Sequence, residues 1–324
     1  MENCYLQVSE MCNILGGITP QSIYKTLKNK DLKSIMLSAR KKVLPPSTVR
    51  IMLEDKGFKF NKKIISFHMI KGGVGKTTLS ATTGVRASHY GCKTLLIDFD
   101  LQANLTRSFN LSLNNENIWI NVIKNECDIK DAIVKIDDHL DLLPSNLNNS
   151  MLDIHMSQNN TNLKDIVSDY LQSVINDYDL IIIDCPPAIN KVSASAICAS
   201  NQVIIPLNPD QYAMDGLEMT IHEIQNLKKS FKLKNLDYRI VWNKYDARKR
   251  LGAIYMHDLA KEVDASKILP VVIRVDSSYE NAVANATSIF EITRSTPAKE
   301  DIDQTTKEIL GISQWAESKS TNAA

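Results

Sequence analysis

The segment KGGVGKTT, residues 71–78, combines glycines, lysines and threonines in a spacing suited to holding a triphosphate. Glycines let the backbone approach an anion closely, and a turn that leads from a strand into a helix points several N–H groups at one place. A lysine adds a point charge for the outer phosphates, and the next hydroxyl can bind Mg²⁺. The segment therefore predicts ATP and Mg²⁺ as ligands, with nucleotide contacts from Gly72, Gly73, Val74, Gly75, Lys76, Thr77 and Thr78 and a metal contact from Thr77.

Three aspartates follow apolar stretches of the kind that form buried strands. Asp98 and Asp100 lie in LLIDFD, and Asp184 ends LIIID. Ligands of open α/β sheets collect at the carboxyl ends of the strands, so these carboxylates should meet the phosphate loop in one crevice. There they could hold Mg²⁺ and orient water for in-line attack on a phosphate. The alternative is that each aspartate only caps its strand or the following helix.

Short apolar strands alternate with longer amphipathic segments over residues 63–312, which predicts an α/β domain with a mostly parallel central sheet flanked by helices. The stretch 147–162 is rich in Asn and Ser and is expected to be a surface loop, and residues 313–324 are expected to be a polar tail. The strands are predicted at Ile64–Met69, Thr94–Asp98, Leu140–Leu143, Leu180–Asp184, Gln202–Pro206 and Tyr238–Asn243.

Residues 1–62 are predicted to form a separate, small helical domain. Residues 1–63 hold 12 Lys and Arg against 5 Asp and Glu, so this end is basic although the whole chain carries only +1. Helices are expected at 8–15 and 19–28, separated by two glycines, with a third after Pro45-Pro46. This order fits a winged helix-turn-helix, and a basic helical extension used for dimerisation is the alternative. The predicted major-groove contacts are Gln21, Ser22, Lys25 and Lys28.

The phosphate loop departs from the usual pattern, because Ile70 stands where a glycine is expected and Lys71 follows it. In this form, K-G-G-x-G-K-[ST]-T, the loop resembles the deviant phosphate loop of the ParA/MinD superfamily. The string D-x-D-x-Q-x-N that begins at Asp98 resembles the second motif of ParA proteins, although Leu101 replaces a common proline. The resemblance covers nearly the whole chain and is most specific between Lys71 and Asp184.

The resemblance implies a P-loop ATPase whose subunits pair when ATP is bound. Catalytic roles would fall to Lys71, which crosses to the partner's nucleotide, to Lys76, and to Asp100, which orients the attacking water. Asp98 and Asp184 would lie at the metal. Asn243 would read the edge of adenine, and the segment 208–216 would rearrange with the nucleotide state.

In ParA proteins the ATP-bound homodimer binds DNA without sequence preference, through scattered basic residues. Arg248 matches a family arginine, Lys249 and Arg250 lie beside it, and Arg274 lies near a second family position that is Ser277 here. The N-terminal region resembles operator-binding extensions of larger plasmid ParA proteins, which implies autorepression at the chain's own operator. The expected function is plasmid or chromosome partition in the cytoplasm, at the nucleoid, with a ParB-type centromere-binding protein as partner.

Several other classes of protein are disfavoured by the sequence. The six cysteines are scattered without a C-x-x-C pair, which argues against zinc, iron–sulfur and disulfide frameworks. A membrane-bound ATPase of the MinD kind needs a basic amphipathic C-terminal helix, whereas residues 299–324 are acidic, so no membrane partner is expected. Two alternatives stay open: a nucleotide-sensing transcriptional regulator, and an ATPase that positions another cellular cargo.

Overall fold

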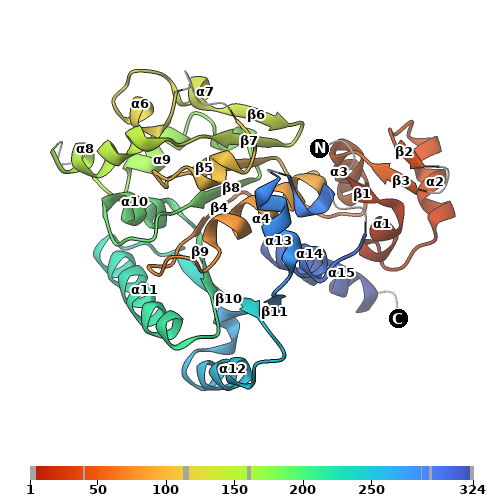
Figure 1. Ribbon diagram of the computed structural model, residues 1–324. Helices are drawn as coiled ribbons and strands as arrows, with labels where there is room; N and C mark the ends of the chain where they lie inside the picture. Colours follow the sequence, from red (N-terminus) through yellow and green to blue (C-terminus); the bar gives the residue numbers. More distant parts are fainter. Residues whose placement is uncertain are drawn as a thin grey trace.

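A sheet of eight strands forms the centre of the molecule within the residues that the structure describes. This computed structural model describes residues 5–38, 41–111, 117–158, 162–285, 287–291 and 294–321 (Figure 1). All neighbouring strands are parallel except at one edge, where β6 is antiparallel to β7. The strand order is β11 (Ile268–Arg274), β10 (Asp237–Tyr245), β9 (Gln202–Leu207), β4 (Lys63–Phe67), β8 (Leu180–Asp184), β5 (Thr94–Asp98), β7 (Leu140–Leu143) and β6 (Val134–Asp137).

Helices cover both faces of this sheet, because the central strands are apolar on both faces. In β8, Ile181 and Ile183 pack into one hydrophobic core, whereas Leu180 and Ile182 pack into the core on the opposite face. One face carries α4 (Lys76–His89), α13 (Ser277–Ala284) and α14 (Pro297–Leu310). The other face carries α6 (Trp119–Ile123), α7 (Ile129–Ala132), α8 (Leu152–Gln158), α9 (Ile166–Leu171), α10 (Lys191–Ala199), α11 (Gln211–Ser230) and α12 (Arg250–Glu262).

The predicted α/β class is confirmed, and β5, β7 and β8 have the predicted bounds. Strands β6 and β11 were not predicted. The prediction of a loop over residues 147–162 is wrong for its described part, which forms the short helix η2 (Leu147–Met151) and α8. The reason is packing, since Leu152 and Met156 of this segment are fully buried.

The N-terminal region contains three helices, as predicted, and also a small antiparallel sheet whose strands the sequence did not locate. Its strands have only two to four residues, too few to leave an alternating pattern in the sequence. The helix pair α1–α2 is joined by the two glycines, and the hairpin β2–β3 follows it. In chain order the elements are β1 (Leu6–Gln7), α1 (Val8–Ile14), α2 (Pro20–Asn29), β2 (Ile35–Ser38), β3 (Lys41–Leu44) and α3 (Pro46–Asp55).

The C-terminal segment differs from the predicted polar tail, because residues 312–321 form the helix α15 (Ile312–Thr321). Ile312 is buried in the same hydrophobic cluster as the N-terminal helices, and the Trp315 ring lies 5.4 Å from the Phe58 ring. The C-terminal helix therefore packs against the N-terminal region, as Figure 1 shows. Among the described residues, no helix is long and apolar enough to cross a membrane.

Candidate nucleotide-binding site

The phosphate loop joins β4 to α4, as predicted, and its geometry requires glycine. Gly73 and Gly75 have φ values of +74° and +94°, a region that side-chain-bearing residues rarely adopt. A Cβ at Gly75 would also lie 2.3 Å from Asn243 Nδ2, which is too close for any real contact. The loop therefore brings bare backbone to the start of α4, where free N–H groups and the helix dipole favour an anion.

Lys76 begins α4 and is held inside the loop. Its side chain is only 6% exposed, and its Nζ donates to the carbonyl oxygens of Met69 at 2.9 Å and Lys71 at 3.1 Å. Burial lowers the pKa of Lys76, and the nearby carboxylate of Asp184 opposes that effect. An ammonium has three donors, so one remains for a phosphate oxygen.

The two predicted metal carboxylates meet, as the strand pattern predicted. Asp98 and Asp184 are paired in register at the ends of β5 and β8, and both side chains are fully buried. Thr77 Oγ1 donates to Asp184 Oδ2 at 2.7 Å, which places the predicted hydroxyl beside the predicted carboxylate. Burial raises the pKa of Asp184 to about 8 and that of Asp98 to about 7, so a cation at this place would favour the ionised forms.

Two supporting hydroxyls were not found from the sequence. Ser80 Oγ lies 3.1 Å from Asp184 Oδ1, and Thr106 Oγ1 donates to Asp98 Oδ2 at 2.7 Å. Ser80 could have been found, because it lies three residues after Thr77 and therefore on the same side of α4. Thr106 could not, since its approach to Asp98 depends on the path of the chain after β5.

The donor set fits Mg²⁺ bound together with phosphates. The described residues contain no cluster of three or more His, Cys, Asp and Glu side chains suited to a metal. Mg²⁺ does not need one, since it usually binds through one or two carboxylates, substrate phosphates and water. Thr77 and Asp184 supply such oxygens at the mouth of the loop. Asp98 has fewer lone pairs free for a metal, because its oxygens accept hydrogen bonds from Asp100 N at 3.1 Å and from Thr106.

Asp100 lies in the turn after β5, at the same carboxyl edge of the sheet as the phosphate loop. Its Oδ1 accepts a bond from Gln102 N at 2.9 Å, and Ser145 Oγ donates to its backbone oxygen at 2.8 Å. Ala103, at the end of this turn, has φ +54°, a left-handed conformation that is uncommon outside glycine. The Asp100 carboxylate is thus placed by a tight, strained turn and is half-buried.

Lys71 points away from Lys76 and toward α11. Its Nζ donates to Asp210 Oδ1 at 2.5 Å and lies 5.6 Å from the centre of the Tyr212 ring. Asp210 also caps α11, because the same oxygen accepts a bond from Ala213 N at 2.9 Å. The second loop lysine is therefore partly exposed at the edge of the crevice, against the segment that the family resemblance predicts to rearrange.

Asn243 lies beside the loop, and its amide is turned toward it. Asn243 Nδ2 donates to Val74 O at 2.7 Å, so in this structure the side chain supports the phosphate loop. The next residue, Lys244, donates from Nζ to Gly73 O at 2.8 Å. Two consecutive residues at the end of β10 thus hold two carbonyls of the loop, a contact that sequence spacing alone did not predict.

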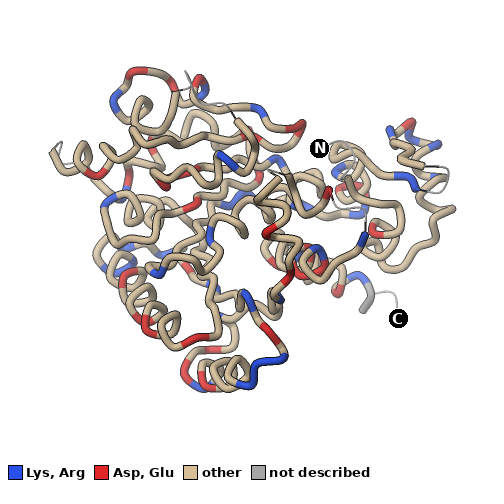
Figure 2. Tube along the Cα trace, viewed as in Figure 1, with Lys and Arg blue, Asp and Glu red and all other residues tan. Residues whose placement is uncertain are grey.

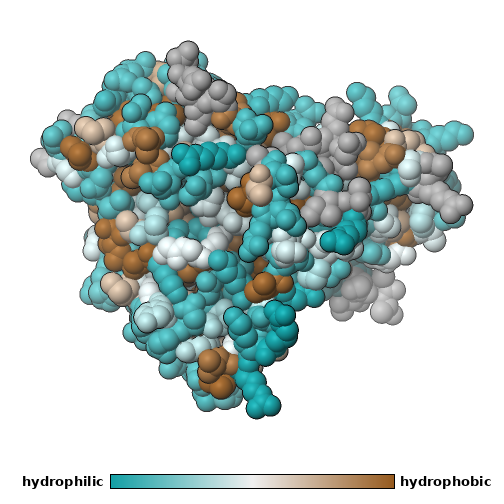
Figure 3. Space-filling view, viewed as in Figure 1, coloured by the Kyte–Doolittle hydropathy of each residue, from teal (hydrophilic) through white to brown (hydrophobic). Residues whose placement is uncertain are grey.

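Apart from Arg274 in β11, the candidate DNA contacts lie in two separate segments, α2 in the N-terminal region and the start of α12; Figure 2 colours the Lys and Arg positions along the chain. The four side chains on α2 are all exposed: Gln21, Ser22, Lys25 and Lys28. Three exposed cations precede or begin α12: Arg248, Lys249 and Arg250. On the face drawn in Figure 3, apolar residues form separate patches between hydrophilic ones.

Two of the candidate arginines have carboxylate partners within the chain. Arg248 is 86% exposed and forms a fork with both oxygens of Asp246, at 2.8 Å each. Arg274 donates to Asp301 at 2.6 Å and to Glu300 at 3.3 Å. Arg274 therefore joins β11 to α14, whereas the side chain of Arg248 remains in solvent.

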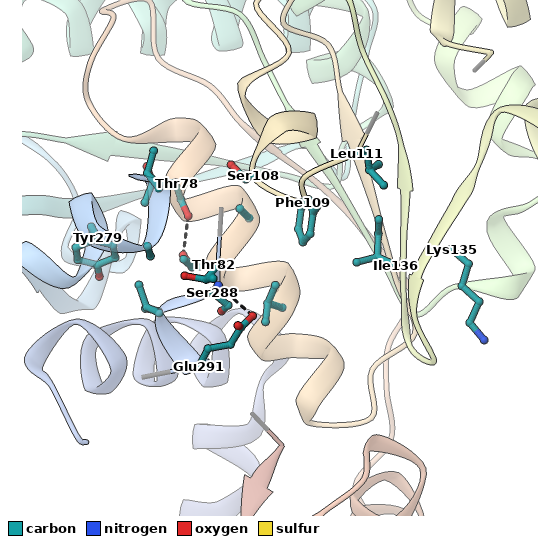
Figure 4. Close-up of a pocket in the computed structure, with 16 residues that line it drawn as sticks. Thr78, Thr82, Ser108, Phe109, Leu111, Lys135, Ile136, Tyr279, Ser288 and Glu291 are labelled. Atoms are coloured by element: carbon teal, nitrogen blue, oxygen red, sulfur yellow. Dashed lines mark hydrogen bonds between the residues drawn. The ribbon is translucent and has the colours of Figure 1, made fainter. Parts of the chain in front are cut away.

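A second cavity lies beside α4 and is drawn in Figure 4. Its volume is about 220 Å³, and its wall includes Thr78 and Thr82 of α4, Phe109, Ile136 of β6 and Tyr279 of α13. Most of this wall is apolar, and Lys135 points away from it in Figure 4. The cavity shares Thr78 with the end of the KGGVGKTT segment, but its mostly apolar wall does not suit a triphosphate.

Comparisons with known proteins agree with this geometry. A family model described as an AAA domain matches residues 62–238. The virulence plasmid ParA family protein pGP5-D of Chlamydia psittaci is 30% identical over 255 residues, which cover 76% of this chain and 94% of that protein. A crystal structure of a plasmid partition protein from Borrelia burgdorferi is 25% identical, with a TM-score of 0.57 and coverage of 72% of this chain and 100% of that one. Cobyrinic acid a,c-diamide synthase from Mycobacterium smegmatis, solved with an ATP analogue and magnesium, shares the fold at 22% identity and a TM-score of 0.66, covering 77% of this chain and 94% of that one. The chain therefore belongs to the ParA family of P-loop partition ATPases.

Proposed function

We propose that this chain binds ATP and Mg²⁺, pairs with a second copy in the ATP-bound state, and uses DNA binding and ATP hydrolysis to segregate a plasmid or chromosome. The observation that carries the proposal is the arrangement of the two loop lysines. Lys76 lies inside the phosphate loop, whereas Lys71 is partly exposed at its edge and is held by Asp210. Within one subunit Lys71 is directed at Asp210 and away from Lys76, whereas in a dimer it could reach the partner's nucleotide.

Nucleotide binding would use the loop as it stands. Backbone N–H groups of the loop would donate to the phosphates, and Lys76 would turn its free donor toward an outer phosphate oxygen. Thr77 and Asp184 would hold Mg²⁺, which supplies positive charge to the phosphates when bound. Asn243 would support the loop by holding the carbonyl of Val74, whereas the exposed Lys244 only contacts the carbonyl of Gly73.

Hydrolysis would depend mainly on position and charge, since phosphoryl transfer needs little covalent chemistry from the protein. Asp100 would accept a hydrogen bond from the attacking water and aim it at the outer phosphate. Lys71 of a second copy would leave its own Asp210 and neutralise charge on the same phosphate. The requirement for a partner lysine explains why a lone subunit would turn over slowly.

The remaining parts of the function follow from the two basic surfaces. We assign non-specific DNA binding to Arg248, Lys249 and Arg250, and operator binding to the α1–α2 helix pair with β2–β3 as its wing. Arg274 is left out of this assignment because Asp301 and Glu300 already hold it. A ParB-type protein would stimulate hydrolysis, and the cargo complex would lie on the nucleoid in the cytoplasm.

Replacing Lys71 by alanine should abolish dimerisation while ATP still binds. The wild-type chain should change from monomer to dimer on addition of ATP and Mg²⁺, because Lys71 reaches the partner's phosphates. Sedimentation velocity with and without nucleotide measures this directly, and Lys244→Ala is the matched control because it removes another lysine that touches the loop. A wild-type chain that stays monomeric with ATP, or a Lys71→Ala chain that still pairs, would contradict the proposal.

The variant Asp210→Asn tests the resting contact of Lys71. Asparagine keeps the cap on α11 but removes the negative charge that holds Lys71. Exposed ion pairs are worth at most about 1 kcal/mol, so dimerisation should need about 2- to 5-fold less ATP. Sedimentation over an ATP series would detect the shift, and a shift toward more ATP would show that Asp210 assists the dimer instead.

The two basic surfaces should contribute to different kinds of DNA binding, and variants of each should show this. Removing Arg248, Lys249 and Arg250 together should weaken binding to random duplex DNA, and the slope of log K against log salt should become shallower by about 1 for each lost phosphate contact. Fluorescence anisotropy at several salt concentrations measures both. The matched control is Lys130→Ala, because Lys130 is an exposed lysine on α7, outside both surfaces.

The double variant Lys25→Ala/Lys28→Ala should behave differently. It should retain random-DNA binding but lose protection of the DNA upstream of its own gene in a footprinting assay, because α2 lies on the other surface. Equal losses on both DNAs for both variants would show that the chain has a single DNA surface.

A further inference from the structure

The last turns of α4, the helix that starts at the phosphate loop, contain a buried arginine that contacts the N-terminal region. Arg86 is only 2% exposed. Its Nη2 donates to Glu10 Oε1 at 2.6 Å, and its Nε donates to Asp303 Oδ1 at 2.6 Å. The guanidinium also lies close to the ring centres of Tyr90 and Phe290, at 5.1 and 5.0 Å. Its charge is thus balanced by one carboxylate from α14 and one from α1.

Glu10 has a second contact that fixes the start of α1. Its other oxygen, Oε2, accepts a bond from the backbone N–H of Gln7 at 2.7 Å, and Gln7 is the N-cap of α1. One carboxylate therefore closes the first helix of the predicted DNA-binding pair and also holds the nucleotide helix. The contact between α4 and α1 is direct at this point.

A second attachment between the two regions is tightly packed. Gly91 has φ +80°, and a Cβ there would lie 2.5 Å from Pro46 O and 2.6 Å from Arg50 Cβ. Arg50 of α3 donates to Gly91 O at 2.8 Å and to Asp179 at 2.5 Å. These contacts leave no space for sliding, so α3 and the end of α4 should move as one body.

The Arg86–Glu10 contact, by contrast, borders an open groove. This groove has a volume of about 880 Å³ and separates the N-terminal region from α14, and its lining includes Glu10, Lys41, Arg86, Asp303 and Lys307. The tight contact at Gly91 can therefore act as a pivot, with the ion pair on the open side. A small tilt of α4 would be transmitted to α1 there, because Arg86 is buried and its separation from either of its two carboxylates is costly.

We propose that the Arg86–Glu10 ion pair couples the phosphate loop to the N-terminal helix pair, so that nucleotide binding changes the stability and DNA affinity of α1–α2. The inference rests on the proposed nucleotide binding and adds its regulation. Because energetic coupling is reciprocal, DNA bound at α2 should change the affinity for nucleotide by the same factor.

Hydrogen exchange in the full-length protein tests this coupling without any DNA. Peptides that cover α1 should change their exchange rate at least about 3-fold when AMPPNP and Mg²⁺ are added, a coupling of a size common between linked sites. In Glu10→Gln, the change in α1 exchange on addition of nucleotide should be less than half of that in the wild type. The reason is that glutamine still caps α1 but has no charge for Arg86. The control Lys307→Gln removes another partner of Asp303, at 2.7 Å, without touching α1, and should behave as wild type.

The outcomes separate this proposal from the proposed function. If AMPPNP binds, as measured by calorimetry on the same samples, and α1 exchange is unchanged in the wild type, the coupling is absent and the ATPase proposal stands. If Glu10→Gln responds as fully as wild type, the ion pair is not the path. If no AMPPNP binds, both proposals fall. Should Glu10→Gln fold poorly, Glu10→Asp repeats the test. Aspartate keeps the negative charge, but its shorter side chain weakens the contact with Arg86.

Discussion

Lys76→Met is expected to weaken ATP binding by at least about 100-fold and to leave the fold intact. Methionine has nearly the length of lysine but no charge, so the loop loses the cation that meets the outer phosphates. Charge-assisted contacts in a partly desolvated site are worth about 3 kcal/mol, which corresponds to about 100-fold in affinity. Titration with a fluorescent ATP analogue in the presence of Mg²⁺ measures the loss.

A second lysine at the same loop provides the control. Lys244 also donates to a loop carbonyl, that of Gly73, but its side chain is exposed. Lys244→Met should therefore change ATP affinity by no more than about 3-fold, the effect of an exposed contact. Equal losses in the two variants would mean that Lys76 has no special place at the phosphates, and an unaffected Lys76→Met would remove the basis of the nucleotide site.

The central part of this site could be predicted because its geometry follows from local rules. Apolar runs such as Leu180–Asp184 predict strands buried on both faces, and such strands are parallel neighbours in most α/β folds. The acidic residues at their ends must then meet at one edge of the sheet, as Asp98 and Asp184 do. The glycines of the loop could be predicted for a similar local reason, because a backbone that faces phosphates cannot carry a side chain there.

The contacts between distant segments could not be predicted in this way. Thr106 reaches Asp98, and Asn243 reaches Val74, only because the chain returns to the sheet edge at those points. The helix α15 was missed because its apolar residues are few, and Trp315 is stabilised by Phe58, which is distant in the sequence. The ion pair between Arg86 and Glu10 likewise joins two segments whose sequences carry no common pattern.

The buried pair Asp98 and Asp184 leads to a prediction about stability and pH. Burial raises the pKa of Asp184 to about 8, whereas an aspartate in the unfolded chain titrates near 4. Between these values the folded state binds more protons than the unfolded state. The free energy of unfolding of the nucleotide-free protein should therefore fall as the pH rises from about 4 to about 8. Asp98, with a pKa of about 7, acts in the same direction.

Asp184→Asn should remove one of these two titrations. Over the range from about pH 5 to pH 8 the variant should lose less stability than the wild type, by an amount on the order of a few kcal/mol. The reason is that a pKa difference of one between the folded and the unfolded chain corresponds to about 1.4 kcal/mol. Urea unfolding at several pH values without nucleotide measures the effect. At the high end of the range the variant should be the more stable protein, although it should bind Mg²⁺ more weakly.

A matched carboxylate with the opposite shift provides the control. Arg248 holds the pKa of Asp246 at about 2, so Asp246 is ionised in both the folded and the unfolded chain above about pH 5. The free energy of unfolding of Asp246→Asn should therefore change with pH in the same way as that of the wild type over the whole range. If the unfolding free energy of Asp184→Asn also had the pH dependence of the wild type, Asp184 would already be ionised without a metal. Its charge would then have to be compensated by Lys76 alone. Addition of Mg²⁺ and AMPPNP should reduce the pH dependence of the wild type, because a cation beside Asp184 favours the carboxylate and not the acid.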